Sequence, residues 1–329
     1  MKRLLALLLI LVACIPAWAA KAPPYTYFRV GSANDVTTAT TAGTVLMGGG
    51  TDVDAAFQWM CGLAGNGDFL VIRATGTDAY NPYIQQLCPG ANSVATLIIP
   101  STAAANDANV AAIMQKAEAI WIAGGDQSNY INFWTGTPVQ AILKSKISAG
   151  VPVGGTSAGM NVLTQFVYSA LAPQGATSSQ SLADPFNRYL TFARDFANVP
   201  KLTGVIGDPH FVTRDRMGRD LAFLCRVATN GWSNAPRGVA VDEQTALLID
   251  GNGNATVVGS STAYFLQAPG LPQVCAAKTP LTYLNIAVQR INSSGTFNFG
   301  TWTATGATNY TVSANAGVLS STQAGGSAY

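Results

Sequence analysis

Residues 151–163 read V-P-V-G-G-T-S-A-G-M-N-V-L and are the most informative segment of the chain. A short apolar run ends in two glycines, and Ser157 then stands between small residues, ahead of an apolar segment typical of a helix. A sharp strand-to-helix turn requires such small neighbours, because a bulky side chain would clash with the strand or the helix. The turn presents the serine hydroxyl where N–H groups of the helix N-terminus stabilise a developing oxyanion. The pattern G-x-S-x-G also fits a glycine-rich loop with an incidental serine, so the rest of the chain must decide.

Apolar runs, glycine-rich turns and helical patterns alternate through the first half of the chain. Strands are predicted at residues 44–47, 68–73, 94–100 and 119–123, and helices at 52–63, 106–117 and 138–149. This alternation predicts βαβ units and a parallel sheet covered on both faces. Because ligands of such sheets bind beyond the carboxyl ends of the strands, the glycine-rich turns at 48–50, 124–125 and 154–155 should converge on one edge.

The second half of the chain is less regular. The patterns predict a short helix at 187–194, a helix at 214–229, a strand at 237–243 and a hairpin around residues 250–253. The last 50 residues or so alternate and are rich in Ser, Thr and Gly, which predicts added antiparallel strands. A soft tail is expected from about Ser320.

The charge balance limits the possible partners. Lys and Arg number 18 against 16 Asp and Glu, so no field strong enough to attract nucleic acid is expected. Only 10% of residues are charged, against about a quarter in typical proteins, which favours an exported protein. With one histidine and no C-x-x-C spacing, the cysteines indicate no metal site, and no cofactor is predicted.

The N-terminus has the character of an export signal. Met1-Lys2-Arg3 forms a positive region, residues 4–13 are apolar but too short to span a bilayer, and Ala17-Trp18-Ala19 supplies a cleavage pattern. We therefore predict a signal peptide at 1–19 and a secreted or periplasmic protein of one α/β domain at 20–329, in which 256–329 form a β-rich extension. Alternatively, Cys14 fits the acylated cysteine of a bacterial lipoprotein, and the protein would then be anchored to the outer membrane; no other stable membrane contact is expected.

Four further cysteines, Cys61, Cys88, Cys225 and Cys275, form an even set in an oxidising compartment. Three pairings are possible. Closeness in sequence favours Cys61 with Cys88 and Cys225 with Cys275.

His210 is the only histidine, so it is the only imidazole that could serve Ser157 as a base. It follows an apolar run and Gly-Asp-Pro, as expected for the end of a strand. Glu243 follows the apolar run 238–241 and is the candidate to orient the imidazole, with Asp242 as its competitor. The order Ser, His, Glu differs from that of α/β-hydrolases, which argues against that fold.

Four segments together resemble the cyanophycinase family, which belongs with the dipeptidase E-like serine peptidases of peptidase family S51. They are residues 120–127 (I-W-I-A-G-G-D-Q), 154–160 (G-G-T-S-A-G-M), 208–220 (D-P-H-F-V-T-R-D-R-M-G-R-D) and 238–246 (G-V-A-V-D-E-Q-T-A). The resemblance covers roughly residues 44–250. It implies an α/β three-layer sandwich with a mainly parallel sheet, similar to class I glutamine amidotransferases (flavodoxin-like), plus C-terminal antiparallel strands, and it suggests a homodimer.

The resemblance also implies roles for particular residues. Ser157 would be the nucleophile, His210 the base and Glu243 the orienting acid, with oxyanion N–H groups from Ala158 and Gly125. The implied substrate-binding residues are Gln127, Asp208, Arg214, Arg216 and Arg219. The implied activity is that of a secreted serine exopeptidase. It would hydrolyse cyanophycin, a poly-aspartate whose side chains carry arginine, to β-Asp-Arg dipeptides through an acyl-enzyme.

Two departures from the family pattern leave alternatives open. Pro209 stands where the family usually has Gln, and Asp220 stands where it tends to have an apolar residue. The alternatives are a peptidase or esterase of this fold with another substrate, and a catalytically silent binding protein. An amidotransferase would need a cysteine at the turn. The arginines also fit an exposed helix with Asp215–Arg219 and Arg216–Asp220 pairs four residues apart.

Overall fold

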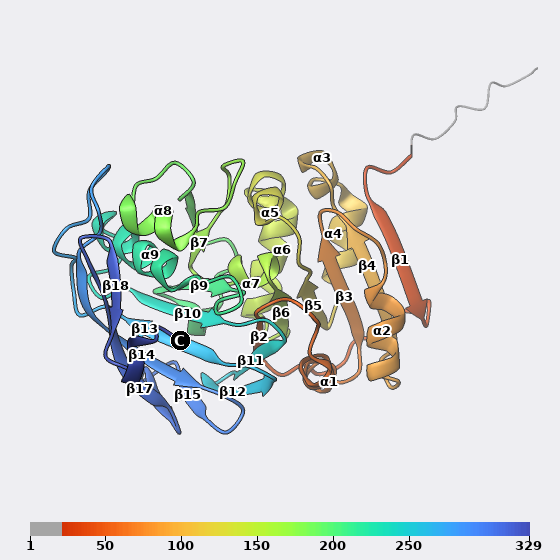
Figure 1. The fold of residues 1–329 in the computed structure, drawn as a ribbon. Coiled ribbons are helices and arrows are strands. Elements are labelled where there is room, and N and C mark those ends of the chain that lie inside the picture. The colour runs from red at the N-terminus through yellow and green to blue at the C-terminus, as the bar shows by residue number, and fades with distance from the viewer. Residues whose placement is uncertain (1–21) are drawn as a thin grey trace, which may run out of the picture.

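The computed structural model describes residues 22–329 (Figure 1). The predicted signal peptide at 1–19 and the alternative acylation at Cys14 lie outside the described residues and stay predictions. Between residues 22 and 329, no helix is long and apolar enough to cross a bilayer.

The first of two sheets is built around five adjacent parallel strands. Its ten strands are, in spatial order, β1 (Thr26–Gly31), β4 (Ser93–Ile98), β3 (Asp68–Arg73), β5 (Ala119–Ile122), β6 (Val153–Thr156), β2 (Gly43–Met47), β11 (Thr245–Asp250), β12 (Asn254–Gly259), β15 (Thr296–Asn298) and β16 (Thr303–Thr305). The run from β4 to β2 is parallel, and the strands on either side of it are antiparallel. The five parallel strands are almost wholly buried, as continuous apolar sequences require.

The second sheet lies at the opposite end of the molecule from β1 (Figure 1). Its eight strands are, in order, β18 (Val318–Ser321), β17 (Thr308–Asn315), β14 (Tyr283–Ile291), β13 (Ala263–Gln267), β10 (Arg237–Val241), β9 (Val205–Pro209), β7 (Phe166–Tyr168) and β8 (Phe192–Arg194). Strands β7, β9 and β10 are parallel, and the remaining neighbours are antiparallel. The predicted C-terminal antiparallel strands are therefore present.

Helices connect these strands and cover the sheets. They are α1 (Asp54–Leu63), α2 (Tyr80–Leu87), α3 (Thr102–Ala105), α4 (Ala108–Gln115), α5 (Gln127–Trp134), α6 (Pro138–Ser148), α7 (Ala158–Asn161), α8 (Ser178–Ala183) and α9 (Met217–Thr229), with short 3-10 turns at Pro200–Leu202 and Ala324–Gly326. Side-chain caps fix the residue at which several helices begin, because they accept hydrogen bonds from N–H groups that a helix leaves unpaired. Asp107 accepts from Asn109 N, Asp126 accepts from Ser128 N, and Thr177 forms a capping box with Gln180.

Three hydrophobic clusters define the layers. One packs α1 and α2 on one face of the first sheet. A second packs α4, α5 and α6 on its other face and continues between the two sheets, where Phe265 of β13 stacks on Phe297 of β15 with ring centroids 3.5 Å apart. The third packs α8 and α9 on the outer face of the second sheet. The α/β fold is confirmed, and both sheets are mixed.

The second sheet is the main difference from the sequence-based prediction. The sequence predicts one mainly parallel sheet with antiparallel additions. In the structure, β7, β9 and β10 are not part of the first sheet and lie in one sheet with the C-terminal strands. Alternate residues of β10 explain this arrangement: Val239 and Val241 join the core between the sheets, while Ala240 joins the core under α9. A strand with two apolar faces does not reveal which sheet it will enter.

Two local predictions are wrong. No helix forms at 187–194: residues 192–194 form strand β8 instead, where Phe192 packs edge-on against Phe223. The expected soft tail from Ser320 is also wrong. Strand β18 includes Ser321, and the Tyr329 hydroxyl is hydrogen-bonded to Asp215 and Met217.

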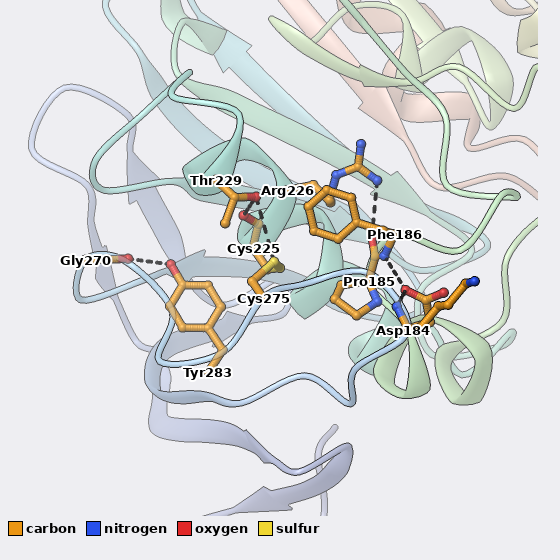
Figure 2. Close-up of a disulfide and its surroundings, with 10 residues drawn as sticks. Asp184, Pro185, Phe186, Cys225, Arg226, Thr229, Gly270, Cys275 and Tyr283 are labelled. Atoms are coloured by element: carbon orange, nitrogen blue, oxygen red, sulfur yellow. Dashed lines mark hydrogen bonds between the residues drawn. A yellow bond between two sulfur atoms is a disulfide. The ribbon is translucent and has the colours of Figure 1, made fainter.

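The structure contains the two disulfides that closeness in sequence favours, Cys61–Cys88 and Cys225–Cys275. Figure 2 shows the second one, which joins α9 to the loop before β14.

Candidate active site

Ser157 occupies the sharp turn between β6 and α7. Its φ of 54° and ψ of −113° are unusual for a residue with a side chain, so the backbone here is strained. The flanking glycines make the turn possible. A Cβ on Gly155 would lie 2.5 Å from the carbonyl carbon of Gly159, and one on Gly159 would overlap the carbonyl oxygen of Ile122. The G-x-S-x-G pattern is therefore required by close backbone packing.

Ser157, His210 and Glu243 form one chain of hydrogen bonds. Ser157 Oγ lies 2.7 Å from His210 Nε2, and His210 Nδ1 lies 2.5 Å from Glu243 Oε1. A carboxylate can only accept, so Nδ1 carries the proton and Nε2 is free to accept from the serine hydroxyl. Ser157 follows β6 of the first sheet, while His210 and Glu243 follow β9 and β10 of the second. The site thus lies where the two sheets meet.

Burial favours the neutral form of His210. The residue is only 5% exposed, and this desolvation is the main cause that lowers the pKa of His210 below its usual value. The hydrogen bond to Glu243 acts in the opposite direction, while the charges of Arg214 and Arg216 lower the pKa further. A neutral imidazole is the state that can take a proton from Ser157.

The glycine-rich turns converge on these side chains, as their positions in the sequence predict. A Cβ on Gly49 would overlap the His210 ring, and one on Gly124 would lie 3.5 Å from Ser157 Cβ. Gly125 follows in the same turn. Ala158 is the first residue of α7, so its N–H is one that a helix leaves without an intrahelical acceptor. Both residues proposed to bind an oxyanion therefore lie on turns that border Ser157.

Asp242 has a different position from Glu243. It accepts hydrogen bonds from the backbone N–H groups of Val212 and Thr213 and from the hydroxyls of Thr213 and Ser261. It therefore fixes the turn after His210, and Glu243 is the acid that contacts the imidazole.

Arg214 and Arg216 line a cavity of about 420 Å³ beside this turn, together with residues 175–179. The Arg214 side chain is 53% exposed, and its Nε lies 3.5 Å from Glu243 Oε1. Arg216 is more enclosed: it donates to the carbonyl oxygen of Pro209 at 2.6 Å and to Asp208 Oδ1 at 3.4 Å. Burial lowers the pKa of Arg216 to about 10, which leaves it charged at neutral pH.

Asp215 and the nearly buried Arg219 also line this cavity, and the buried Asp208 is the partner of Arg219. The Asp208 side chain is fully buried, and Arg219 donates to both of its oxygens. The guanidinium of Arg219 lies over the rings of Tyr168 and Phe223. Asp208 thus pairs with both Arg216 and Arg219. That Asp208 and Arg219 contact substrate stays a prediction.

The alternative interpretation of α9 as an exposed helix is wrong. Arg219 pairs with Asp208 instead of Asp215, and Asp220 is fully buried. Neither carboxyl oxygen of Asp220 has a hydrogen-bond partner among residues 22–329. Gln127, the first residue of α5, follows the Gly124–Gly125 turn, and its Nε2 donates to the Tyr168 carbonyl oxygen.

Sequence reasoning missed two contributors to the site. The first is α8, which begins at the capping box of Thr177 and Gln180 and places Ser178 and Ser179 in the cavity wall. The Thr-x-x-Gln spacing is the sequence pattern that could have predicted this helix start. Tyr329, 119 positions after His210, packs against Phe211. No local pattern marks that contact.

Known proteins resemble this chain in sequence and in fold. Residues 93–257, half of the chain, match the model of peptidase family S51, and this range contains Ser157, His210 and Glu243. A cyanophycinase of Geminocystis herdmanii is 26% identical over 216 residues, which cover 64% of this chain and 72% of that relative. Cyanophycinases of Trichormus variabilis and a Nostoc species are also 26% identical over 216 residues, covering 64% of this chain and 66% of each relative.

Among solved structures, a peptidase from an acI-B1 Actinobacterium is similar in fold. The TM-score is 0.52 at 16% sequence identity, and the alignment covers 79% of this chain and 98% of that one.

Proposed function

This chain belongs to peptidase family S51, and from that premise we propose that it is a serine hydrolase with Ser157 as its nucleophile. The observation that carries the proposal is the hydrogen-bond chain from Ser157 through His210 to Glu243. A nucleophile, a base within reach of it and a third group that orients the base are together the requirements for acyl transfer.

The first half-reaction uses the neutral imidazole. His210 Nε2 takes the proton as Ser157 Oγ attacks the scissile carbonyl carbon, and Glu243 stabilises the imidazolium that forms. The N–H groups of Ala158 and Gly125 bind the resulting oxyanion. His210 then gives its proton to the leaving amine, which departs and leaves an acyl-enzyme on Ser157. In the second half-reaction, water loses a proton to His210 and its oxygen attacks the ester carbonyl carbon. His210 then gives this proton to Ser157 Oγ as the acyl–oxygen bond breaks, which releases the carboxylate product and restores the hydroxyl.

For the substrate we propose cyanophycin, cut to β-Asp-Arg dipeptides. Two observations support this: the curated relatives are named cyanophycinases, and the cavity beside the triad is lined by Arg214 and Arg216. An aspartate polymer presents carboxylates, for which guanidinium groups are well-suited partners. Gln127 would add a polar contact at the start of α5.

A second candidate is a peptidase or esterase that acts on another substrate. Pro209 favours it, because proline offers no side-chain hydrogen bond where the family usually has Gln, and its carbonyl oxygen is already occupied by Arg216. A silent binding protein is the third candidate.

One experiment separates the three. Wild type, Ser157→Ala and the control Ser148→Ala, a change at the end of the distant helix α6, are assayed on insoluble cyanophycin and on soluble β-Asp-Arg peptides. We expect dipeptide release by wild type and Ser148→Ala, and a loss of at least about a thousandfold in Ser157→Ala. If soluble peptides are cut and the polymer is not, the hydrolase remains and the cyanophycin substrate is wrong. If neither is cut and a serine-reactive phosphonate does not label Ser157, the binding protein is the better description.

We further propose that the protein is exported and folds as one domain of the class I glutamine amidotransferase type over residues 20–329. Two disulfides support export, because such bonds persist in oxidising compartments. The hydrophobic core shared by the two sheets supports a single domain. Mass spectrometry of the mature N-terminus would distinguish cleavage after Ala19 from acylation at Cys14.

A further inference from the structure

The segment after β18 returns to the active-site side of the second sheet. Its main chain is held there by the Tyr310 hydroxyl, which donates to the Ala328 carbonyl oxygen at 2.9 Å, and by Gln323 Nε2, which donates to the Ser327 carbonyl oxygen at 2.9 Å. Tyr329 therefore lies against the turn that connects His210 with α9.

The Tyr329 hydroxyl bridges two residues of that turn. It accepts from the backbone N–H of Met217 at 2.7 Å and donates to Asp215 Oδ1 at 2.9 Å. Its ring packs edge-on against Phe211 and Tyr264, with centroids 5.6 and 6.2 Å away. Burial raises the pKa of Tyr329, so the hydroxyl keeps the proton that it donates to Asp215.

Arg216 lies between the two bridged residues. Asp215 has a φ of 47°, a left-handed conformation that residues with side chains adopt at a cost. Apart from Tyr329, the Asp215 end of the turn is held by Ser178, whose hydroxyl donates to the Asp215 carbonyl oxygen at 2.5 Å. The backbone on both sides of Arg216 is thus held by side chains from distant parts of the chain.

We infer that Tyr329 is a positioning residue for substrate recognition: by bridging Asp215 and Met217 it fixes Arg216 in the cavity wall, where the guanidinium meets a substrate carboxylate. The identity of that carboxylate rests on the proposed function. The bridge itself rests on the geometry alone. Tyr329 touches neither Ser157 nor the reacting atoms, so it acts through Arg216 on binding and not on the chemical step.

Tyr329→Phe tests the bridge, because it removes the hydroxyl and keeps the ring. Tyr283→Phe is the matched control: its hydroxyl donates to the Gly270 carbonyl oxygen at 2.6 Å, beside the Cys225–Cys275 disulfide (Figure 2). On soluble β-Asp-Arg peptides we expect Tyr329→Phe to raise KM about fivefold, because both hydrogen bonds of the bridge are lost and the contact of Arg216 with substrate weakens, with kcat within about twofold. Phosphonate labelling of Ser157 should be unchanged, and Tyr283→Phe should change neither constant.

Two measurements that need no substrate keep this test separate from the proposed function. Amide hydrogen exchange at Met217 and the rate at which phenylglyoxal modifies Arg216 should both rise in Tyr329→Phe and stay at wild-type values in Tyr283→Phe. If both stay unchanged, the inference is overturned. It is overturned equally if phosphonate labelling slows in parallel with the rise in KM, because the effect would then be a general loss of structure. If the wild type cuts no β-Asp-Arg peptide but both rates rise, the bridge stands and only the proposed substrate fails.

Discussion

At the scale of single residues, the surroundings of His210 shift its pKa in opposite directions. Burial and two arginines favour the neutral imidazole, while the hydrogen bond to Glu243 favours the charged one, and the pKa is lowered overall. Since His210 must be neutral to accept the Ser157 proton, activity should rise with pH through this lowered pKa and remain high above it.

Arg214→Gln should raise the pKa of His210. It removes a positive charge near the ring, and because a nearby cation disfavours the imidazolium, the charged form becomes more stable in the variant. We expect a small upward shift, since the Arg214 side chain is 53% exposed and its charge is screened by water. His210 is the only histidine, so NMR titration of 13C-histidine-labelled protein without a histidine tag reads the shift directly.

The control for that titration is Lys144→Gln, which removes a charge from α6. It should leave the His210 curve in place. A curve that moves equally in both variants would mean that net charge, and not the position of Arg214, sets the pKa.

At the scale of elements, α9 carries an unpaired acid in its first turn. Asp220 is fully buried, and desolvation, with the nearby charge of Asp208, raises its pKa well above the ordinary value although Arg219 opposes this. The raised pKa means that the folded state binds a proton that the unfolded state has released. Stability therefore falls as pH rises from the ordinary pKa of aspartate toward the raised one.

Asp220→Asn should relieve this loss. The neutral amide has nearly the same shape and never ionises, so the free energy of unfolding should exceed that of wild type at pH 8 by at least about 1 kcal/mol. The difference should shrink toward pH 5, because a larger fraction of the wild-type carboxyl is then protonated. Urea unfolding at both values measures it, with Asp78→Asn as the control. A variant that is less stable than wild type at pH 8 would show that the Asp220 carboxylate is needed.

Prediction at the element scale succeeded where the sequence pattern is local and failed where packing decides. The parallel strands, α1, α4 and α6 follow from apolar spacing and were predicted. Strand β8 was predicted as a helix, because its pairing with β7 and the contact between Phe192 and Phe223 cannot be seen in the sequence. Tertiary contacts override such short local signals.

At the scale of the whole molecule, the two sheets are joined by the core between them, and each contributes to the site. The second sheet is also tied to its covering helix, because the Cys225–Cys275 disulfide links α9 to the loop before β14 across 50 residues. A crosslink of this length restricts the unfolded chain considerably.

Replacing Cys225 and Cys275 together by serine should lower the free energy of unfolding by about 3–4 kcal/mol, the entropy expected from a loop of this size. Urea unfolding under non-reducing conditions measures the loss. Because Ser157, His210 and Glu243 lie away from this bond, the variant should keep its activity at low temperature. An inactive but fully folded variant would mean that the disulfide also sets the position of α9 for catalysis.

Features that depend on neighbouring residues follow from local sequence patterns. Gly155 and Gly159 around Ser157 specify the sharp turn, since no larger residue fits there. The continuous apolar runs specify buried parallel strands, and closeness in sequence indicated both disulfides. His210 was the one available base because the chain has no other histidine.

Which distant groups meet depends on tertiary packing. It brings Glu243, not the adjacent Asp242, to the imidazole, buries Asp208 against Arg219, and places Tyr329 on the turn before α9. The physical reason is that these contacts join segments brought together by sheet pairing and core packing. The free energy of such contacts comes from burial and from geometry, which no local pattern in the sequence records.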